Sequence, residues 1–269
     1  MTLSQSPNLL LIEKMNNTKV SILVSSCDKY YEAWMPFFTL LDKYWEKCLF
    51  PKYLLTETIS YSDFGVTTIN CQSKEWSNRL IYALERIDTE YILFLLEDFF
   101  IMGTVDNEAI NRYISFLEND KSMSVIYLKT IAGQKTVSSE YPELIKMEVG
   151  KKYYMNFQAA IWRRKDLKSI LKPGLSPWEI EENISRSVRS GDFYCVRNSS
   201  YTDCSHDVIP YLWSLKTGYG ICKSKWLWNN KSFFKREGIP CKCESLPMLS
   251  KLSYLIDKYS RLIKCKVLN

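Results

Sequence analysis

The sequence predicts an α/β protein, Rossmann-like, in which helices flank a mostly parallel central sheet and an amphipathic helical tail follows. Short β-rich runs alternate with segments of helical periodicity, and the connections between them are short. One wholly apolar run, residues 91–96, ends abruptly in two acids. That run is too short to span a membrane and has the composition of a buried central strand.

The chain opens with a strand, a polar turn and a helix. Residues 20–25 are β-rich and stop at a turn that contains Ser25 and Asp28, and residues 30–48 carry large apolar side chains three and four positions apart. This is the opening unit of a nucleotide-binding α/β fold. We expect Asp28 either to accept hydrogen bonds from a base or ribose, or to cap the helix.

Two further strands and a helix lead to the central strand. Residues 52–57 and 66–71 have strand composition, and a helix begins near Arg79. Arg79 can bind a phosphate, pair with Asp98, or be an ordinary surface arginine. Because the connections are short, these strands are expected to be parallel.

Glu97 and Asp98 form the acidic end of the central strand. Ligand sites of open α/β sheets lie at the carboxyl ends of their strands. Two adjacent carboxylates between apolar neighbours are costly to bury unless they bind a cation, a donor-rich ligand or a shared proton. The alternative is a pair of ordinary solvated acids.

The second half contains further elements of both kinds. Apolar periodicity predicts a helix over residues 106–119 and a strand over 124–128. Residues 129–150 are polar and irregular, typical of a loop or small hairpin near the mouth of a site. A strand over residues 153–162 then leads to a short helix.

An acidic cluster begins the next helix. Ser176 and Glu179 have the spacing of a capping box, which gives Glu179 a structural role and leaves Glu181 and Glu182 for chemistry. Acids at a helix N-terminus also suit the helix dipole without any further function. Trp178 stands among them.

Two basic segments close the chain. Glycine, lysine and tryptophan alternate over residues 218–228, which indicates a mobile flap in which Lys223 and Lys225 supply positive charge, or lysines that are simply exposed. Residues 245–269 form a basic amphipathic pattern, which predicts a helix that lies on an anionic membrane or docks on protein.

Composition excludes several classes. A net charge of +6 and a pI of about 8.7 are too mildly basic for a dedicated nucleic-acid binder. Nine cysteines without a Cys-x-x-Cys pair are not typical of a disulfide framework or a zinc site, so we expect a reducing cytosol. Cys241, Cys243, Cys265 and the single histidine, His206, fit no standard metal spacing. We expect no signal peptide or membrane span.

Four segments resemble a known family. They are residues 20–26, the Ser-Asn-Arg sequence at 77–79, Leu-Leu-Glu-Asp-Phe-Phe at 95–100 and Gln-Ala-Ala-Ile-Trp at 158–162. Together they resemble bacterial nucleotide-sugar-dependent glycosyltransferases of the GT-A fold, which build surface polysaccharides such as capsule and O-antigen. The resemblance extends over residues 19–228, and its motifs are moderately specific.

The resemblance implies a donor site. In the family an Asp-x-Asp motif holds a divalent cation that bridges the donor diphosphate, and Glu97 and Asp98 fall at that place as candidate ligands of Mn²⁺ or Mg²⁺. Phe99 replaces one expected carboxylate, so the motif alone does not require the ion. A nucleotide sugar, with UDP favoured, would contact Ser25, Asp28, Arg79, Lys223 and Lys225 as well as the two acids.

The resemblance also implies an acceptor site. Glu181 would be the catalytic base of an inverting transfer, with Glu179 as the alternative, while Trp178 and Gln158 would bind a saccharide, expected to be lipid-linked. The expected organisation is a leader (1–18), a donor half (19–128), an acceptor half with flap (129–244) and the tail (245–269).

The expected enzyme is cytoplasmic and can lie on the inner face of the plasma membrane, alone or as a homo-oligomer. A sugar nucleotidyltransferase is the alternative, but it usually needs a glycine-rich loop after the first strand, which residues 25–28 lack. A catalytically inactive carbohydrate-binding relative is a further alternative, because Phe99 stands where the family has a carboxylate.

Overall fold

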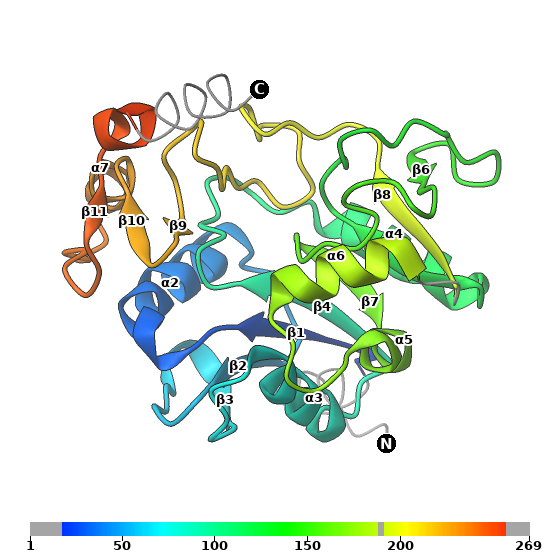
Figure 1. Ribbon diagram of the computed structural model, residues 1–269, viewed down its shortest axis with the longest axis horizontal. Coiled ribbons are helices and arrows are strands. Elements are labelled where there is room, and N and C mark those ends of the chain that lie inside the picture. Colours follow the sequence, from blue (N-terminus) through cyan, green and yellow to red (C-terminus); the bar gives the residue numbers. More distant parts are fainter. Residues whose placement is uncertain (1–17, 188–190, 257–269) are drawn as a thin grey trace, which may run out of the picture.

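The computed structural model describes residues 18–187 and 191–256, which contain an eight-stranded central sheet (Figure 1). Its strands are β1 (Val20–Ser25), β2 (Lys52–Thr56), β3 (Val66–Asn70), β4 (Tyr91–Leu96), β5 (Met123–Tyr127), β6 (Leu144–Lys146), β7 (Ala160–Arg163) and β8 (Asp192–Val196). They lie in the order β3-β2-β1-β4-β7-β5-β8-β6. β7 is antiparallel to β4 and β5, β6 is antiparallel to β8, and the other pairs are parallel. The predicted mostly parallel α/β sheet is confirmed.

Helices cover both faces of this sheet. They are η1 (Asp28–Ala33), α2 (Trp34–Tyr44), η2 (Asp63–Gly65), α3 (Trp76–Arg86), α4 (Asn107–Asn119), α5 (Arg164–Ile170), α6 (Pro177–Ser187) and α7 (Asn230–Glu237). Alternate residues of each strand face opposite ways, so Ile22 and Val24 pack with α2 and α4 while Leu23 packs with α3 and α5. All six residues of β1 are buried, as a central strand requires.

The predicted helix over residues 30–48 is shorter and divided. Residues 28–33 form the 3₁₀ helix η1, Tyr30 is non-helical within it, and α2 begins only at Trp34. Pro36 explains the break: it has no N–H and clashes with the carbonyl four residues before it, so it suits the first turn of a helix and not the interior. The sequence pattern of apolar residues continued across both elements and concealed the boundary.

The predicted strand over residues 153–162 is also shorter, since β7 covers only Ala160–Arg163. Tyr153 has a φ of +64°, which no extended strand accommodates. Within residues 129–150, β6 forms the edge of the sheet, and Val137 pairs with Ile145 in an antiparallel bridge, so the small hairpin that was one of the two predictions for this segment is confirmed.

A smaller sheet follows α6 and β8. It consists of β9 (Ile221–Cys222), β10 (Lys225–Leu227) and β11 (Met248–Leu249), and Figure 1 shows it at one side of the molecule near α2. The predicted tail helix therefore does not start at residue 245. Met248 still pairs with Trp226 in the small sheet, so helical backbone begins only at Lys251. Ser250 caps this helical segment, because its Oγ accepts a hydrogen bond from the backbone N–H of Ser253 at 3.0 Å.

Most of the predicted tail helix, residues 257–269, lies outside the described part. So do residues 1–17 of the predicted leader at 1–18. No helix within the described ranges is both long and apolar enough to cross a membrane.

Candidate active site

The site is built on the end of β4, next to the end of β1. Ser25 pairs with Leu96 in the parallel register, so Glu97 and Asp98 follow directly beside the turn that leaves β1. Both acids are only 6% exposed, and Phe99 and the residue after it are buried more deeply still. Two carboxylates thus lie side by side in a largely apolar position at the carboxyl edge of the sheet, where α/β proteins bind ligands.

Burial changes the protonation of both acids. It raises the pKa of Asp98 to about 7, and it raises the pKa of Glu97 well above its ordinary value with the neighbouring Asp98 charge as a second cause. Asp98 is partly compensated, since its Oδ2 accepts hydrogen bonds from the backbone N–H of Ile221 at 2.7 Å and from the indole N–H of Trp213. The Glu97 backbone N–H and the positive charge of Arg79 lower the pKa of Glu97 and so partly offset this rise.

The Trp213 contact depends on a glycine. Gly220 has a φ of +98°, and a Cβ atom there would lie 2.1 Å from the Trp213 ring. Only glycine therefore allows the ring to lie against the backbone while its N–H reaches Asp98. This role of Trp213 was not predicted, although the Gly-Tyr-Gly sequence at 218–220 beside the aromatic residues was the available signal.

One wall of the site joins Glu181 to β1 through aromatic rings. Ser25 Oγ accepts a hydrogen bond from the Trp76 indole N–H at 3.1 Å, and the Trp76 and Phe157 rings meet edge to face with centroids 4.5 Å apart. The backbone N–H of Phe157 then donates to Glu181 Oε1 at 2.8 Å. A short chain of contacts thus links the predicted base to the strand beside Leu96.

The N-terminus of α6 presents its acids in different ways. Ser176 and Glu179 form the predicted capping box: the Ser176 N–H donates to Glu179 Oε2 at 2.8 Å, and the Glu179 N–H donates to Ser176 Oγ at 3.3 Å. Glu179 is thereby committed to the helix. Burial raises the pKa of Glu181, as a general base needs, and Trp178 is 75% exposed, as a stacking platform needs.

Asp28 and Arg79 both hold the loop after β2. The Asp28 carboxylate accepts hydrogen bonds from the backbone N–H groups of residues 57–59 and from the Thr58 hydroxyl, which lowers its pKa against the opposing effect of burial. It does not cap η1. Arg79 pairs with Glu57 at 3.2 Å and donates to two backbone carbonyls, so the alternative of a pair with Asp98 is wrong.

Gln158 meets the site through Tyr211. The Tyr211 hydroxyl donates to Gln158 Oε1 at 2.9 Å, and its ring stacks on Phe99 with centroids 4.5 Å apart and planes at 16°. Phe99 is thus a packing partner of the segment that carries Trp213.

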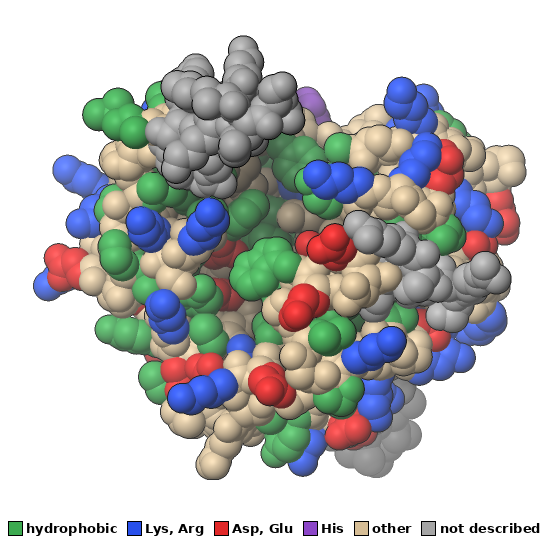
Figure 2. All heavy atoms as spheres, viewed as in Figure 1, with side chains coloured by type: hydrophobic (Ala, Val, Ile, Leu, Met, Phe, Trp, Pro, Cys, Tyr) green, Lys and Arg blue, Asp and Glu red, His purple; other side chains and the backbone are tan. Residues whose placement is uncertain are grey.

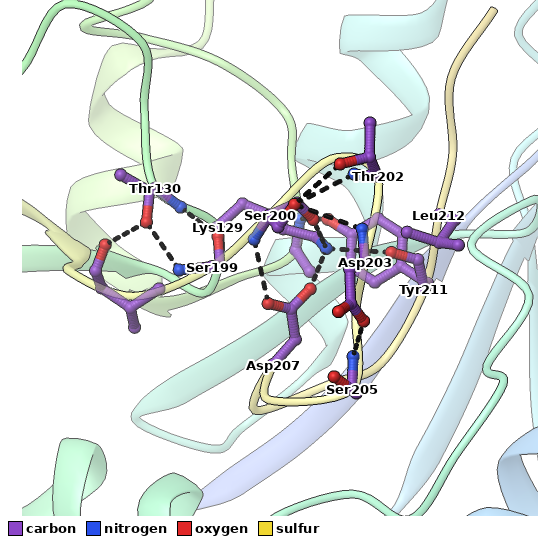
Figure 3. Close-up of polar contacts among 12 residues, drawn as sticks. Lys129, Thr130, Ser199, Ser200, Thr202, Asp203, Ser205, Asp207, Tyr211 and Leu212 are labelled. Atoms are coloured by element: carbon purple, nitrogen blue, oxygen red, sulfur yellow. Dashed lines mark hydrogen bonds and ion pairs between the residues drawn. The ribbon is translucent and has the colours of Figure 1, made fainter. Parts of the chain in front are cut away.

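A buried ion pair fixes this same segment (Figure 3). Lys129, just past β5, points toward Asp207, and each side chain is 1% exposed. The Lys129 ammonium also donates to the carbonyls of Tyr211 at 2.9 Å and Ser200 at 3.2 Å. This pair therefore fixes Tyr211, two residues before Trp213. Neither Lys129 nor Asp207 was predicted, because they are 78 residues apart and neither stands in a motif.

The flap segment is a tight hairpin. Lys223 and Ser224 both have positive φ, +49° and +56°, as a two-residue turn between β9 and β10 requires. Ser224 Oγ lies 3.3 Å from the Tyr30 hydroxyl, which brings the turn over η1. Lys223 and Lys225 are exposed. Figure 2 shows a hollow in this face, with basic side chains on the β9–β10 side and acidic ones on the α6 side.

Gly220 anchors the base of this hairpin. Its N–H donates to the Asn230 side chain at 3.0 Å, and Asn230 donates back to the Gly220 carbonyl at 2.7 Å. The mobility of the flap over residues 218–228 stays a prediction.

His206 is exposed, in the loop that contains Asp207. Within the described ranges, no cluster of three or more His, Cys, Asp or Glu side chains could hold a metal ion. Two adjacent carboxylates without a paired cation nevertheless fit a Mg²⁺ or Mn²⁺ ion that takes its other ligands from substrate phosphates and water.

Comparison with known proteins gives structural similarity only. No protein-family model and no curated protein matches the chain. TarS 1–349 of S. aureus has a TM-score of 0.43 and 13% identity over 65% of this chain and 60% of that one. The bifunctional IspDF from Campylobacter jejuni has a TM-score of 0.41 and 16% identity over 68% of this chain and 50% of that one. A cytidylyltransferase from Leptospira borgpetersenii has a TM-score of 0.39 and 13% identity over 68% of this chain and 77% of that one.

The similar structures include glycosyltransferases and nucleotidyltransferases, and two of those of TarS hold UDP or UDP-GlcNAc. The chain spans less than two thirds of the TarS fragment and of IspDF. Structural likeness at this level does not single out one activity.

Proposed function

We propose that this chain is a glycosyltransferase that moves a sugar from a nucleotide diphosphate donor to a hydroxyl group of a saccharide acceptor. The observation that supports it is the buried pair Glu97 and Asp98 at the carboxyl end of β4, with raised pKa values and, among the described residues, no ion pair to a cationic side chain. Such a pair favours a ligand that brings positive charge, which a cation–diphosphate complex does.

The donor diphosphate lies between these acids and the β9–β10 turn. Glu97 and the Asp98 oxygen that Trp213 and Ile221 do not use would hold a Mg²⁺ or Mn²⁺ ion, which when bound offsets charge on the leaving diphosphate. Lys223 and Lys225 supply further positive charge from the turn. Asp28 and Arg79 act through the loop at residues 57–59, which they hold beside the nucleoside, here assigned to a uridine.

The acceptor lies on the α6 side. Trp178 offers an exposed ring on which a sugar face can stack, and Gln158 offers an amide held by Tyr211. Glu181 takes the proton of the acceptor hydroxyl as it attacks the anomeric carbon in line, which gives inversion. Its raised pKa brings it nearer to neutrality, where a general base is most effective.

The acceptor class is a lipid-linked saccharide of surface polysaccharide synthesis, met at the inner face of the membrane. Leu252 and Ile256 are exposed on the start of the tail helix beside Lys251. An apolar strip with a basic neighbour suits an anionic lipid surface.

The test is thermal stabilisation by a panel of nucleoside diphosphates, each with Mn²⁺, Mg²⁺ or EDTA. A ligand at one hundred times its Kd stabilises the native state by about 2.7 kcal/mol. We expect a metal-dependent shift with UDP that Asp98→Asn abolishes. The matched control is Asp88→Asn, which changes an exposed carboxylate before the other end of β4 and keeps the shift.

Three results would revise the proposal. A shift that persists in EDTA would remove the ion and leave the lysines to meet the diphosphate charge. Release of diphosphate from a nucleoside triphosphate and a sugar phosphate would identify a nucleotidyltransferase instead. Sugar binding without any nucleotide shift would identify an inactive carbohydrate-binding protein.

A further inference from the structure

The segment after α7 brings two thiols into contact. Cys241 and Cys243 have their sulfur atoms 3.8 Å apart, at the contact distance of a weak sulfur hydrogen bond. None of the eight described cysteines is in a disulfide, and no other pair among them has a hydrogen bond between its thiols. Neither residue belongs to the site proposed above.

The backbone holds this pair in place. Cys243 has a φ of +52°, a left-handed conformation that is unfavourable for a residue other than glycine. The Glu32 carboxylate compensates from η1, because it accepts hydrogen bonds from the backbone N–H groups of Glu244 at 2.9 Å and Ser245 at 2.8 Å. On the other side, the Cys241 N–H donates to the Ile239 carbonyl at 2.9 Å. The two thiols are therefore held together by the fold.

The two thiols differ in reactivity. Cys241 is partly exposed, and the hydrogen bond from Cys243 lowers its pKa, which favours the thiolate. Cys243 is 3% exposed, and the same hydrogen bond, followed by burial, raises its pKa. Burial raises the pKa of Cys48 and Cys195 to about 11, so those thiols are weak nucleophiles at neutral pH.

We propose that Cys241 and Cys243 form a peroxide-sensitive pair that closes reversibly into an intrachain disulfide. The Cys241 thiolate attacks one oxygen of hydrogen peroxide, the O–O bond breaks, and a sulfenic acid and, after protonation, water result. The Cys243 sulfur then attacks the sulfenic sulfur, its proton leaves with the hydroxyl group as a second water, and the S–S bond forms. Two thiols are oxidised and one peroxide is reduced to two waters.

Lys242 makes the product easy to recognise, because trypsin cuts between the two cysteines. Peptides 237–242 and 243–251 separate when the thiols are reduced and stay joined only if a disulfide links them. The experiment treats the full chain with hydrogen peroxide, blocks remaining thiols with N-ethylmaleimide, digests with trypsin and measures peptide masses. We expect the joined peptide, two hydrogen atoms lighter than its parts, and its loss on treatment with dithiothreitol.

Variants distinguish this account from general oxidation. Cys243→Ser should leave a sulfenic acid on Cys241 that dimedone traps, whereas Cys48→Ser should leave the joined peptide unchanged. Oxidation at Cys241 should be roughly tenfold faster than at Cys48. The proposal fails if Cys241 joins another cysteine, Cys265 included, or if Cys48 and Cys195 oxidise first.

Discussion

Two sites in this fold bury carboxylates, one at Asp207 and one at Glu97 and Asp98, and the negative charge is compensated differently in each. At residues 129 and 207 an ammonium and a carboxylate of the chain meet, and carbonyl groups take the remaining ammonium protons. At residues 97 and 98 two carboxylates meet, and within the described residues no cationic side chain contacts either of them. Both sites are built at carboxyl ends of central strands.

The difference teaches where function is to be sought. A buried pair of opposite charges completes itself and fixes the chain around it, here Tyr211 and so Trp213. A buried pair of acids destabilises the protein when both are ionised, so such a pair is a candidate ligand site. The two sites are also connected, because the first holds the segment whose indole N–H donates to Asp98.

The largest effect on stability should follow from breaking the ion pair between Lys129 and Asp207. Lys129→Met leaves Asp207 buried without a cation and should lower the free energy of unfolding by about 3–5 kcal/mol, measured by urea denaturation. Lys121→Met changes an exposed lysine before the other end of β5 and should cost less than about 1 kcal/mol. Recovery of most of the loss in Lys129→Met with Asp207→Leu would confirm that the unpaired charge is responsible. Equal losses in both single lysine variants would contradict this.

A substitution in the pair Glu97 and Asp98 should raise the stability of the protein, whereas Lys129→Met lowers it. Since the pKa of Asp98 is about 7 in the folded state against an ordinary 3.8, the folded state binds the proton more tightly, and its stability falls as pH rises through that window. Asp98→Asn removes this dependence. Its stability relative to the wild type should rise by up to about 1.4 kcal/mol per pH unit between pH 5 and pH 7. A relative stability that is flat or falling over this range would refute the raised pKa.

A smaller effect should follow from removing the link between the two sites. Trp213→Phe deletes the indole donor to Asp98 and leaves the Ile221 N–H, so the loss should be about 1.5–3 kcal/mol at pH 8, where the carboxylate is charged. At pH 5, where Asp98 is protonated, the loss should be smaller. Trp178→Phe is the matched control on an exposed ring. A loss independent of pH would assign Trp213 to packing alone.

The smallest effects concern α6, which neither buried pair touches. Ser176→Ala removes the capping box and should cost about 1 kcal/mol. Trp178→Ala should change stability by no more than about 0.5 kcal/mol, because the ring is exposed, yet it should weaken saccharide binding measured by calorimetry. Loss of stability without loss of saccharide binding would remove Trp178 from the acceptor site.

Local patterns predicted the parts of the fold that local physics determines. The apolar run of β4, the β-rich composition of β1 and β3 and the capping box at Ser176 are all readable from neighbouring residues, and the structure confirms them. The antiparallel position of β7 was not readable, because nothing within those four residues specifies their direction. Strand pairing depends on the whole path of the chain.

The same distinction between local and long-range determinants holds for the residues of the candidate site. Glu97 and Asp98 were recognisable because their carboxylates interrupt an apolar strand. Trp213 was not, because it reaches Asp98 across 115 residues, and its position depends on Gly220 and on the pair at Lys129. Asp28 was recognised as polar and well placed, but sequence could not show that the loop at residues 57–59 already binds its carboxylate.

The most direct test of the account counts protons during ligand binding. If Glu97 and Asp98 hold the cation of a nucleotide complex, binding near pH 6.5 must displace the protons that their raised pKa values retain. Calorimetric titration of the protein with UDP and Mn²⁺ in buffers of different ionisation enthalpy should show proton release for the wild type and for Asp88→Asn. It should show less release or no binding for Asp98→Asn. Binding with the same proton count in all three proteins would contradict a ligand site at the end of β4.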